Sequence, residues 1–298
     1  MIGLILTFIV NWIIVFTLFQ VIQMLTTTFH IGILHVWNEW AGIVLSESGK
    51  MEQNSLFLAA ILLIISAVLS RGSVMQYFLC KVNQCRRPGE EEKLRLRRIF
   101  TNICRKAGID EGKYRLYMCA MPGWNAFAIG NNHIAVTTSL YEYFSDRELM
   151  GIMAHELGHI QHKDTVYLTM KLSMEWIGQL VIRFYSIVVL VLQIFRFIPV
   201  LNIFIAFVTL FFSIQIYFFQ IFMQLPLWFT ERFLSRRQEY AADQYACEIG
   251  LGEELYEGLY KISLREERRS FFQRLTSTHP ETKSRLKKIR SYVEAKYI

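Results

Sequence analysis

Two long stretches without a charged side chain most constrain what this chain can fold into. They are residues 1–29 and 199–230. At 1.5 Å of rise per residue, a helix over either stretch is long enough to cross the roughly 30 Å of hydrocarbon in a bilayer. The chain is 53% hydrophobic and its mean hydropathy is +0.28, both high for a soluble protein. The composition therefore predicts a membrane protein independently of any motif.

Two further apolar segments are interrupted by charge. Leu56 to Ser70 is shorter, and Val74 to Cys80 extends it past Arg71, whereas Trp176 to Phe195 carries Arg183. An arginine in the middle of a membrane is costly, so the alternative for this last segment is a long amphipathic helix at the interface or against the rest of the protein. We expect four apolar helices in all.

Basic residues are unevenly distributed on the two sides of the second apolar segment. Residues 26–53 contain only Lys50, whereas residues 71–98 contain eight basic side chains. Loops rich in Lys and Arg stay in the cytoplasm. Both termini and the domain outside the apolar segments are therefore predicted on the cytoplasmic side of the cell (inner) membrane. The net charge of +7 then reflects topology and contact with anionic lipid headgroups. No motif supports nucleic-acid binding.

The sequence His-Glu-Leu-Gly-His at residues 155–159 specifies a metal site and a reaction together. On a helix, His155 and His159 fall on one face and reach a single ion. Glu156 is turned roughly 100° away and projects beside the ion, where a carboxylate accepts a proton from a water. Residues 145–148 resemble a capping box that opens this helix. The expected cofactor is one Zn²⁺ per chain, because imidazole favours zinc and catalytic zinc keeps a position open for water.

A second motif about eighty residues downstream supplies two carboxylates at the same spacing. Glu239 and Asp243 are i and i+4 on one predicted helix. One of the two can complete a set of two histidines and a glutamate, and the other can accept the free ring N–H of a ligating histidine; the mechanism takes Glu239 as the ligand and Asp243 as the orienting residue. An isolated pair of this kind is more often a solvated surface, but its partnership with residues 155–159 favours the metal site.

Through four sequence motifs, the chain resembles the HtpX-like membrane metalloproteases, which are gluzincins related to the CAAX prenyl proteases. The matching residues are His155, Glu156 and His159, then Ser235, Arg236, Glu239, Ala242 and Asp243, then Thr278-His279-Pro280, and Asn125-Ala126-Phe127-Ala128 before them. The resemblance implies that His279 steadies the oxyanion of the tetrahedral intermediate, and Arg236 is a second candidate for that role. It also implies that Asn125, Ala126, Phe127 and Ala128 form an edge strand that binds an extended substrate; the alternative is an ordinary hairpin packed in the core.

The predicted fold class is mainly α with a small β-sheet, in a multi-pass membrane protein with a zincin-like catalytic domain. Residues 90–107 read as a helix, and residues 114–118, 124–129 and 133–138 read as strands. Residues 1–80 form a membrane region with two helices. Residues 81–175 and 226–298 form the catalytic domain, which a membrane hairpin at residues 176–225 interrupts. The five cysteines are expected to be reduced, small buried residues.

The resulting hypothesis is a membrane-bound zinc metalloendopeptidase that hydrolyses misfolded or damaged membrane proteins. Its partners are protein or peptide substrates and the lipid bilayer, and nucleic acid is not among them. Two alternatives are a processing protease nearer the CAAX prenyl proteases and a membrane scaffold with a structural zinc. The scaffold is disfavoured because structural zinc sites fill four positions with protein groups, mostly cysteines.

Overall fold

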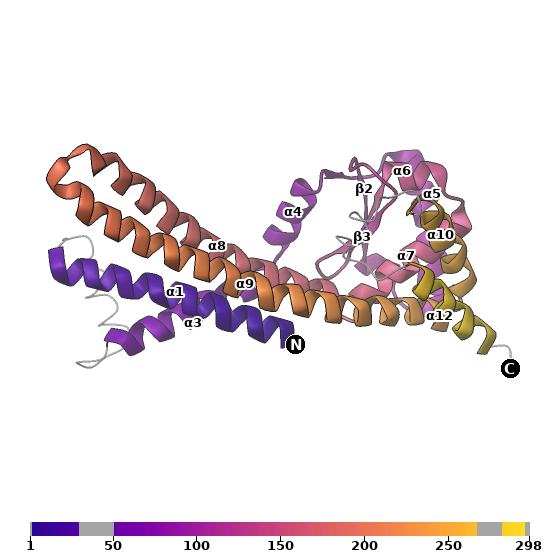
Figure 1. The fold of residues 1–298 in the computed structure, drawn as a ribbon. Coiled ribbons are helices and arrows are strands. Elements are labelled where there is room, and N and C mark those ends of the chain that lie inside the picture. The colour runs from indigo at the N-terminus through magenta and orange to yellow at the C-terminus, as the bar shows by residue number, and fades with distance from the viewer. Residues whose placement is uncertain (1, 30–50, 267–281, 296–298) are drawn as a thin grey trace. The chain divides into compact units, whose positions relative to one another are not determined.

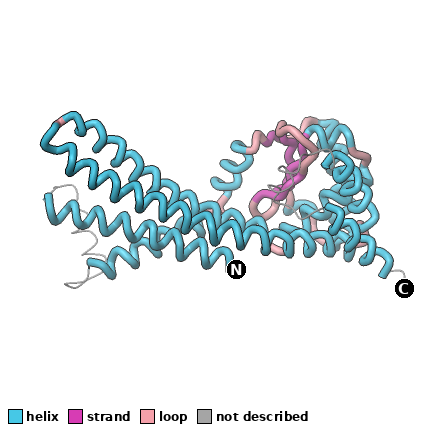
Figure 2. Tube along the Cα trace, in the orientation of Figure 1, coloured by secondary structure: helices cyan, strands magenta, loops and turns pink. Residues whose placement is uncertain are grey.

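The computed structural model describes residues 2–29, 51–266 and 282–295 (Figure 1). The chain divides into two compact units. One comprises residues 1–70 and 170–229, and the other comprises residues 71–169 and 230–298. The first is built from apolar helices alone, and the second combines helices with all the strands that the structure describes (Figure 2). The predicted fold class is confirmed.

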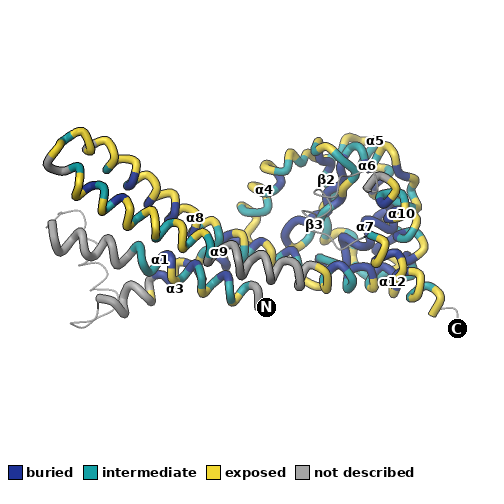
Figure 3. Tube along the Cα trace, in the orientation of Figure 1, coloured by how far each residue is buried: buried dark blue, intermediate teal, exposed yellow. Residues whose placement is uncertain are grey.

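The apolar unit contains the helices α1 (Ile2–Phe29) and α3 (Met51–Leu69), with most of α8 (Asp164–Ile194) and of α9 (Pro199–Glu248). The single turn η2 (Phe195–Phe197) joins α8 to α9. Tyr185 of α8 lies at the centre of the packing, with its ring 5.6 Å from that of Phe212 of α9. Around it pack apolar side chains of α1 and α3. The outer surfaces stay apolar and exposed (Figure 3), as expected for helices that face lipid.

Two segments of the described helices, Asp164–Ile194 and Asn202–Ile221, are long and apolar enough to cross a membrane. Ala59–Leu69 and Ser73–Val82 would make a third span if this bent pair is counted as one. The segment that carries Arg183 therefore has the length and composition of a span, and Arg183 itself is exposed.

The second unit is organised around a four-stranded sheet in the order β1-β2-β4-β3. The strands are β1 (Cys85–Arg86), β2 (Arg115–Cys119), β3 (Ala126–Ile129) and β4 (His133–Thr137). β2 pairs with β4 in parallel, and the two outer pairings are antiparallel. The helices around the sheet are α4 (Ser73–Val82), α5 (Glu90–Ala107), the turn η1 (Glu111–Lys113), α6 (Thr138–Tyr143), α7 (Asp146–Gln161), the end of α9, α10 (Gly252–Glu266) and α12 (Thr282–Ala295). The predicted helix at residues 90–107 coincides with α5, and the predicted strands overlap β2, β3 and β4.

Helix α7 lies in the core of this unit, and two glycines let other helices approach it closely. A Cβ on Gly151 would lie 2.2 Å from the backbone nitrogen of Leu255 in α10. A Cβ on Gly158 would lie 3.0 Å from Cα of Ala242 in α9. The contact at Gly151 requires glycine, because real Cβ atoms do not come so near a neighbouring backbone, and a Cβ at Gly158 would push the two helices apart slightly. Gly158 therefore brings the two motif-bearing helices together.

The start of α7 is held in place by the predicted capping box and by basic side chains. Ser145 Oγ accepts a hydrogen bond from the backbone N–H of Glu148, and Glu148 Oε2 accepts one from that of Ser145 at 2.7 Å. Arg95 of α5 donates to Asp146 Oδ1 at 2.7 Å. Lys261 of α10 lies 3.1 Å from Glu148 Oε2. These bonds fix where the helix begins and thus where its histidines fall.

The expectation that every cysteine is reduced was wrong for one pair. Cys85 and Cys119 form a disulfide between β1 and β2. They are direct partners in the strand register, with Cα atoms 4.2 Å apart, so their side chains meet on one face of the sheet. β1 has two residues and carries no strand pattern, so the sequence did not reveal this register. The other cysteines, Cys80, Cys104 and Cys247, form no disulfide and are buried, as expected.

Candidate metal centre

Three side chains of the second unit converge at one point. His155 and His159 come from α7, and Glu239 comes from α9. Nε2 of His155 lies 3.5 Å from Glu239 Oε2, and Nε2 of His159 lies 3.7 Å from Glu239 Oε1. One ligand atom from each residue lies within 4.8 Å of the others. The two local i, i+4 motifs therefore meet in space.

These distances fit a tetrahedral zinc ion. Two nitrogen or oxygen ligands that each lie about 2.1 Å from zinc at the tetrahedral angle are roughly 3.4 Å apart. The separations of the two histidine nitrogens from the two oxygens of Glu239, 3.5 and 3.7 Å, are close to that value. Two imidazoles and one carboxylate are also the donors of a catalytic site, which leaves a position open. The residues present therefore fit zinc.

Each histidine is oriented by a carboxylate on its other ring nitrogen. Asp243 Oδ1 lies 2.9 Å from Nδ1 of His155, and Asp164 Oδ2 lies 3.0 Å from Nδ1 of His159. When Nδ1 donates to a carboxylate, Nε2 is left with its lone pair facing the cluster. Gln238 Nε2 donates to the second oxygen of Asp164 at 3.0 Å and holds that carboxylate in turn. The sequence motifs indicate an orienting partner for only one histidine, and they do not reveal Asp164, the first residue of α8.

A buried arginine that the sequence analysis also missed joins this cluster. Arg285 of α12 is only 5% exposed and donates to both oxygens of Asp243, at 2.7 and 2.9 Å. Its Nη1 lies 2.7 Å from Glu239 Oε2. Its Nη2 lies 3.3 Å from Nε2 of His155. One guanidinium thus contacts the third candidate ligand and the residue that orients the first, as a planar fork of donors allows.

The charges of the cluster shift the pKa values of its members. Burial and the positive Arg285 both oppose protonation of His155, but hydrogen bonds to Asp243 and Glu239 outweigh them and raise the pKa of His155 to about 9. Burial opposes the charged form of Asp243, but hydrogen bonds from His155 and Arg285 hold its pKa below the usual range. Burial likewise opposes the charge on Arg285, whose pKa the two carboxylates nevertheless raise. Asp243 and Arg285 are therefore kept ionised.

Glu156 faces the edge of the sheet instead of joining the ligand set. Its Oε2 accepts a hydrogen bond from the backbone N–H of Ala128 in β3 at 3.0 Å, and the residue is 9% exposed. β3 is the last strand in the sheet order and pairs only with β4 among the described strands. The carbonyl of Asn125 accepts from Thr137 N–H, on the β4 side. Backbone groups alternate along a strand, so those of Ala126 and Ala128 point to the opposite, open edge.

Residues 90–293 match the family model of Peptidase family M48, which is more than half of the chain. The chain belongs to peptidase family M48. All the candidate ligands, Glu156, Asp164, Arg285 and β3 lie inside the matched region.

Individual relatives agree with this family. Proteins named Protease HtpX homolog from Ralstonia nicotianae and Ralstonia pickettii are each 38% identical to the chain over 81 residues, 26% of this chain. That match spans 28% of the length of those relatives. The crystal structure of S. mikatae Ste24p resembles the chain with a TM-score of 0.51 at 17% identity, covering 92% of this chain and 66% of that one. At this identity the likeness concerns the fold. The predicted resemblance to HtpX-like proteins is confirmed.

Two residues expected in this M48 site are not among those that the structure brings together. His279 lies outside the described residues, so its predicted role stays a prediction. Arg236 is exposed, and among the described side chains it makes no bond to the cluster. Its predicted role also stays a prediction. Arg285 is the arginine that the structure places beside the candidate ligands.

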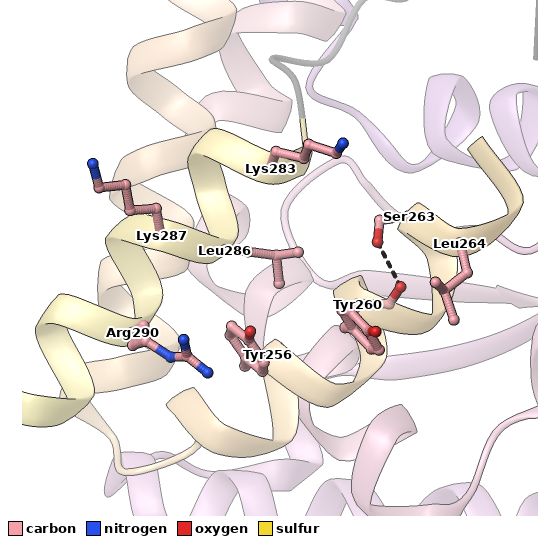
Figure 4. A pocket seen from close by; sticks show the side chains of 8 residues that line it. All are labelled: Tyr256, Tyr260, Ser263, Leu264, Lys283, Leu286, Lys287 and Arg290. Atoms are coloured by element: carbon pink, nitrogen blue, oxygen red, sulfur yellow. Dashed lines mark hydrogen bonds between the residues drawn. The ribbon is translucent and has the colours of Figure 1, made fainter. Parts of the chain in front are cut away.

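A separate pocket lies between α10 and α12 (Figure 4). Its volume is about 380 Å³, and its lining includes Tyr256, Tyr260, Lys283, Lys287 and Arg290. None of the candidate metal ligands is among the residues that line it. The pocket is therefore distinct from the metal centre.

Proposed function

We propose that this protein is a membrane-anchored zinc metalloendopeptidase that hydrolyses peptide bonds of misfolded or damaged membrane proteins. The observation that carries the proposal is the position of Glu156. It follows the candidate ligand His155 in the sequence, and its carboxylate accepts a hydrogen bond from Ala128 on the open edge of β3 at 3.0 Å. A proton acceptor therefore lies between a candidate metal site and a strand able to hold a peptide.

The residues His155, His159 and Glu239 would hold one zinc ion per chain, with Asp243 and Asp164 orienting the histidines. Zinc, when bound, supplies Lewis acidity that activates a water and polarises a carbonyl. Arg285 pairs with both Glu239 and Asp243 and so compensates their negative charge inside the protein. The resemblance further implies that His279 stabilises the developing negative charge, and we retain Arg236 as a candidate for the same task.

The proposed reaction is addition of water across the scissile peptide bond. The backbone groups of Ala126 and the carbonyl of Ala128, on the edge of β3 away from β4, extend the sheet by one strand of substrate, which aligns the scissile carbonyl with the site. The oxygen of the attacking water bonds to the carbonyl carbon while Glu156 accepts a proton from that water. Glu156 then delivers that proton to the leaving nitrogen as the C–N bond breaks. Asn125 and Phe127 hold β3 in the sheet, because their backbone groups face β4.

Replacement of Glu156 by Gln tests the proton-transfer role. The amide keeps the shape of the side chain but cannot take a proton, so we expect normal folding and zinc content with hydrolysis lowered by ~10²–10⁴-fold. Cleavage of unfolded casein, measured beside zinc content, is the assay. A zinc-loaded Glu156→Gln protein that cleaves at nearly the wild-type rate would refute the mechanism.

The substrates are identified by comparing the cleaved proteins in cells that carry the wild type with those in cells that carry the Glu156→Gln variant. Quality control predicts many membrane-protein products that depend on Glu156. A few defined products would favour a processing protease instead. No product that depends on Glu156 would favour a scaffold with a structural zinc.

We also propose that the membrane region comprises residues 1–80, that a hairpin at residues 176–225 enters the membrane, and that residues 81–175 and 226–298 lie in the cytoplasm. The excess of basic residues between 71 and 98 supports this orientation. The Cys85–Cys119 disulfide opposes it, since disulfides persist mainly in oxidising compartments.

Labelling of intact cells decides the orientation. A membrane-impermeant thiol reagent should label a cysteine placed at Ser48 and spare one placed at the exposed Glu91. Position 91 is preferable to Cys85, which is bonded to Cys119. Labelling at position 91 from outside would reverse the proposed topology and would agree with the disulfide.

A further inference from the structure

Helix α4 has one face that packs on the sheet. Leu79 and Cys80 join a cluster with Ile129 of β3 and Ala135 of β4. The side chain of Gln76 covers Gly130, in the turn between these strands, so closely that a Cβ there would lie 2.7 Å from it. This face holds α4 against the hairpin that carries the open edge of β3.

The opposite face of α4 is apolar and exposed. Val74, Tyr77, Phe78 and Val82 are 80%, 71%, 49% and 60% exposed. Their spacing of three, four and eight residues from Val74 places them on one side of the helix. Lys81 lies on the same side and is also exposed. A contiguous apolar face on a short helix marks a surface that another phase or molecule covers.

The charge around α4 identifies what covers that face. No Asp or Glu occurs from residue 53 to residue 89, whereas Arg71, Lys81, Arg86 and Arg87 are all basic. Each basic residue near an anionic membrane surface is worth about 1 kcal/mol of attraction. Lys81 can lay its hydrocarbon stem along the apolar face and extend its ammonium to the phosphates. A tyrosine such as Tyr77 is typical of the headgroup level.

The chain keeps α4 within reach of an apolar helix. Only Ser70, Arg71 and Gly72 separate the last residue of α3 from the first residue of α4. Four extended peptide steps span at most roughly 14 Å. Val68 and Leu69, at the end of α3, are 62% and 68% exposed, as expected for side chains that face lipid. This short connection to an apolar helix favours a bilayer as the occupant of the apolar face of α4.

We propose that α4 is an interfacial helix that lies flat on the membrane surface, bound to anionic phospholipid, and that it links that surface to β3. A helix of this kind inserts its apolar face at the boundary of headgroups and acyl chains. The link to substrate binding rests on the proposed function, whereas the lipid contact does not.

Depth measurements test the lipid contact without any enzyme assay. Nitroxide labels are attached to single cysteines at Val74, Phe78 and Val82 of the full chain in phosphatidylcholine vesicles with and without phosphatidylglycerol. The free cysteines among the described residues are buried, which favours labelling of the introduced ones. A flat helix gives one common depth, and phosphatidylglycerol deepens it. A spanning helix gives depths that differ by roughly 12 Å between positions 74 and 82.

A label at Leu94 is the matched control, because this apolar residue of α5 is 70% exposed in a charged helix. It should remain in water. Graded depths along α4, or three labels as wet as the one at position 94, would overturn the interfacial assignment.

The link to β3 is tested by placing charge on the lipid-facing side. Val74→Glu with Phe78→Glu should raise the KM for a peptide severalfold in phosphatidylglycerol vesicles at unchanged zinc content, and Leu94→Glu should not. An unchanged KM would refute the link. If no peptide is cleaved even by the wild type, the proposed function fails, while the depth measurements still decide the lipid contact.

Discussion

The two units of the chain differ in how far along the sequence their polar side chains form bonds. In the apolar unit, hydroxyl and amide side chains bond to backbone carbonyls three or four residues earlier in the same helix, as Asn11 does to Thr7, Ser66 to Leu63, Ser186 to Ile182 and Ser213 to Thr209. Even its ion pair, Lys171 with Glu175, joins positions i and i+4. These donors find their acceptors within one helix before any helices pack.

The other unit has local bonds of this kind too, such as Thr101 to Arg97, but it adds side-chain bonds that join distant parts of the sequence. Arg285 reaches Asp243 across 42 residues, Arg95 reaches Asp146 across 51, and Lys261 reaches Glu148 across 113. Hydrocarbon offers no partner to a polar group, so a membrane helix must satisfy its own, whereas a water-exposed domain can use polar groups to join its elements. The difference teaches that polar substitutions should have local effects in one unit and collective effects in the other.

Removal of Arg285 should give the largest effect on stability. Arg285→Met leaves Asp243 and Glu239 buried with less compensating charge, which should cost about 3–5 kcal/mol of unfolding free energy in zinc-free protein. The cost should shrink when zinc is added, because the ion restores positive charge. Denaturant unfolding in detergent, with and without a chelator, measures both values.

The matched control for that variant is Lys287→Met, an exposed position of the same helix, which should change stability little. Arg285→Lys keeps the charge without the planar fork and should fall between the two. Equal stability of Arg285→Met and Lys287→Met would break the comparison between the units.

Removal of Asp164 should weaken zinc binding by roughly 10–100-fold, as is typical when the orienting partner of a histidine is lost. The expected reason is that the ring of His159 loses the carboxylate 3.0 Å from its Nδ1. Competition with a chromophoric chelator measures the affinity of Asp164→Ala. Glu239→Ala, which removes a ligand itself, sets the scale and should bind zinc more weakly still. Wild-type affinity in Asp164→Ala would remove this residue from the site.

The smallest effect is expected in the apolar unit. Ser66→Ala removes a bond of 2.8 Å to the carbonyl of Leu63, which keeps its place in the helix. The loss should be below about 1 kcal/mol in the same unfolding assay. A loss as large as that of Arg285→Met would show that polar substitutions are not more local in their effect in the apolar unit than in the other unit.

The sequence predicted the parts of this site that depend on local geometry. The i, i+4 spacings of residues 155–159 and 239–243 hold within any helix, and the capping box at residues 145–148 is equally local. Asp164 was missed because it belongs to the next helix and approaches His159 through the turn between them. Arg285 was missed because an arginine in a basic helix is normally exposed, and only the packing of α12 buries it. The Cys85–Cys119 bond likewise depends on the pairing register of β1, which has only two residues and so no sequence pattern from which the register could be predicted.

The close contact between Gly158 and Ala242 also has a consequence for the newly made chain. The candidate ligands come from helices whose motif residues lie 80 positions apart in the sequence, and they converge only when these helices dock. A partly synthesised or loosely folded copy has the two histidines without Glu239, and so has an incomplete zinc site. Under the proposed function, assembly of the fold is thus itself a safeguard, because the chain would acquire the means to cut other proteins only after it has finished folding and no longer exposes unfolded segments of its own.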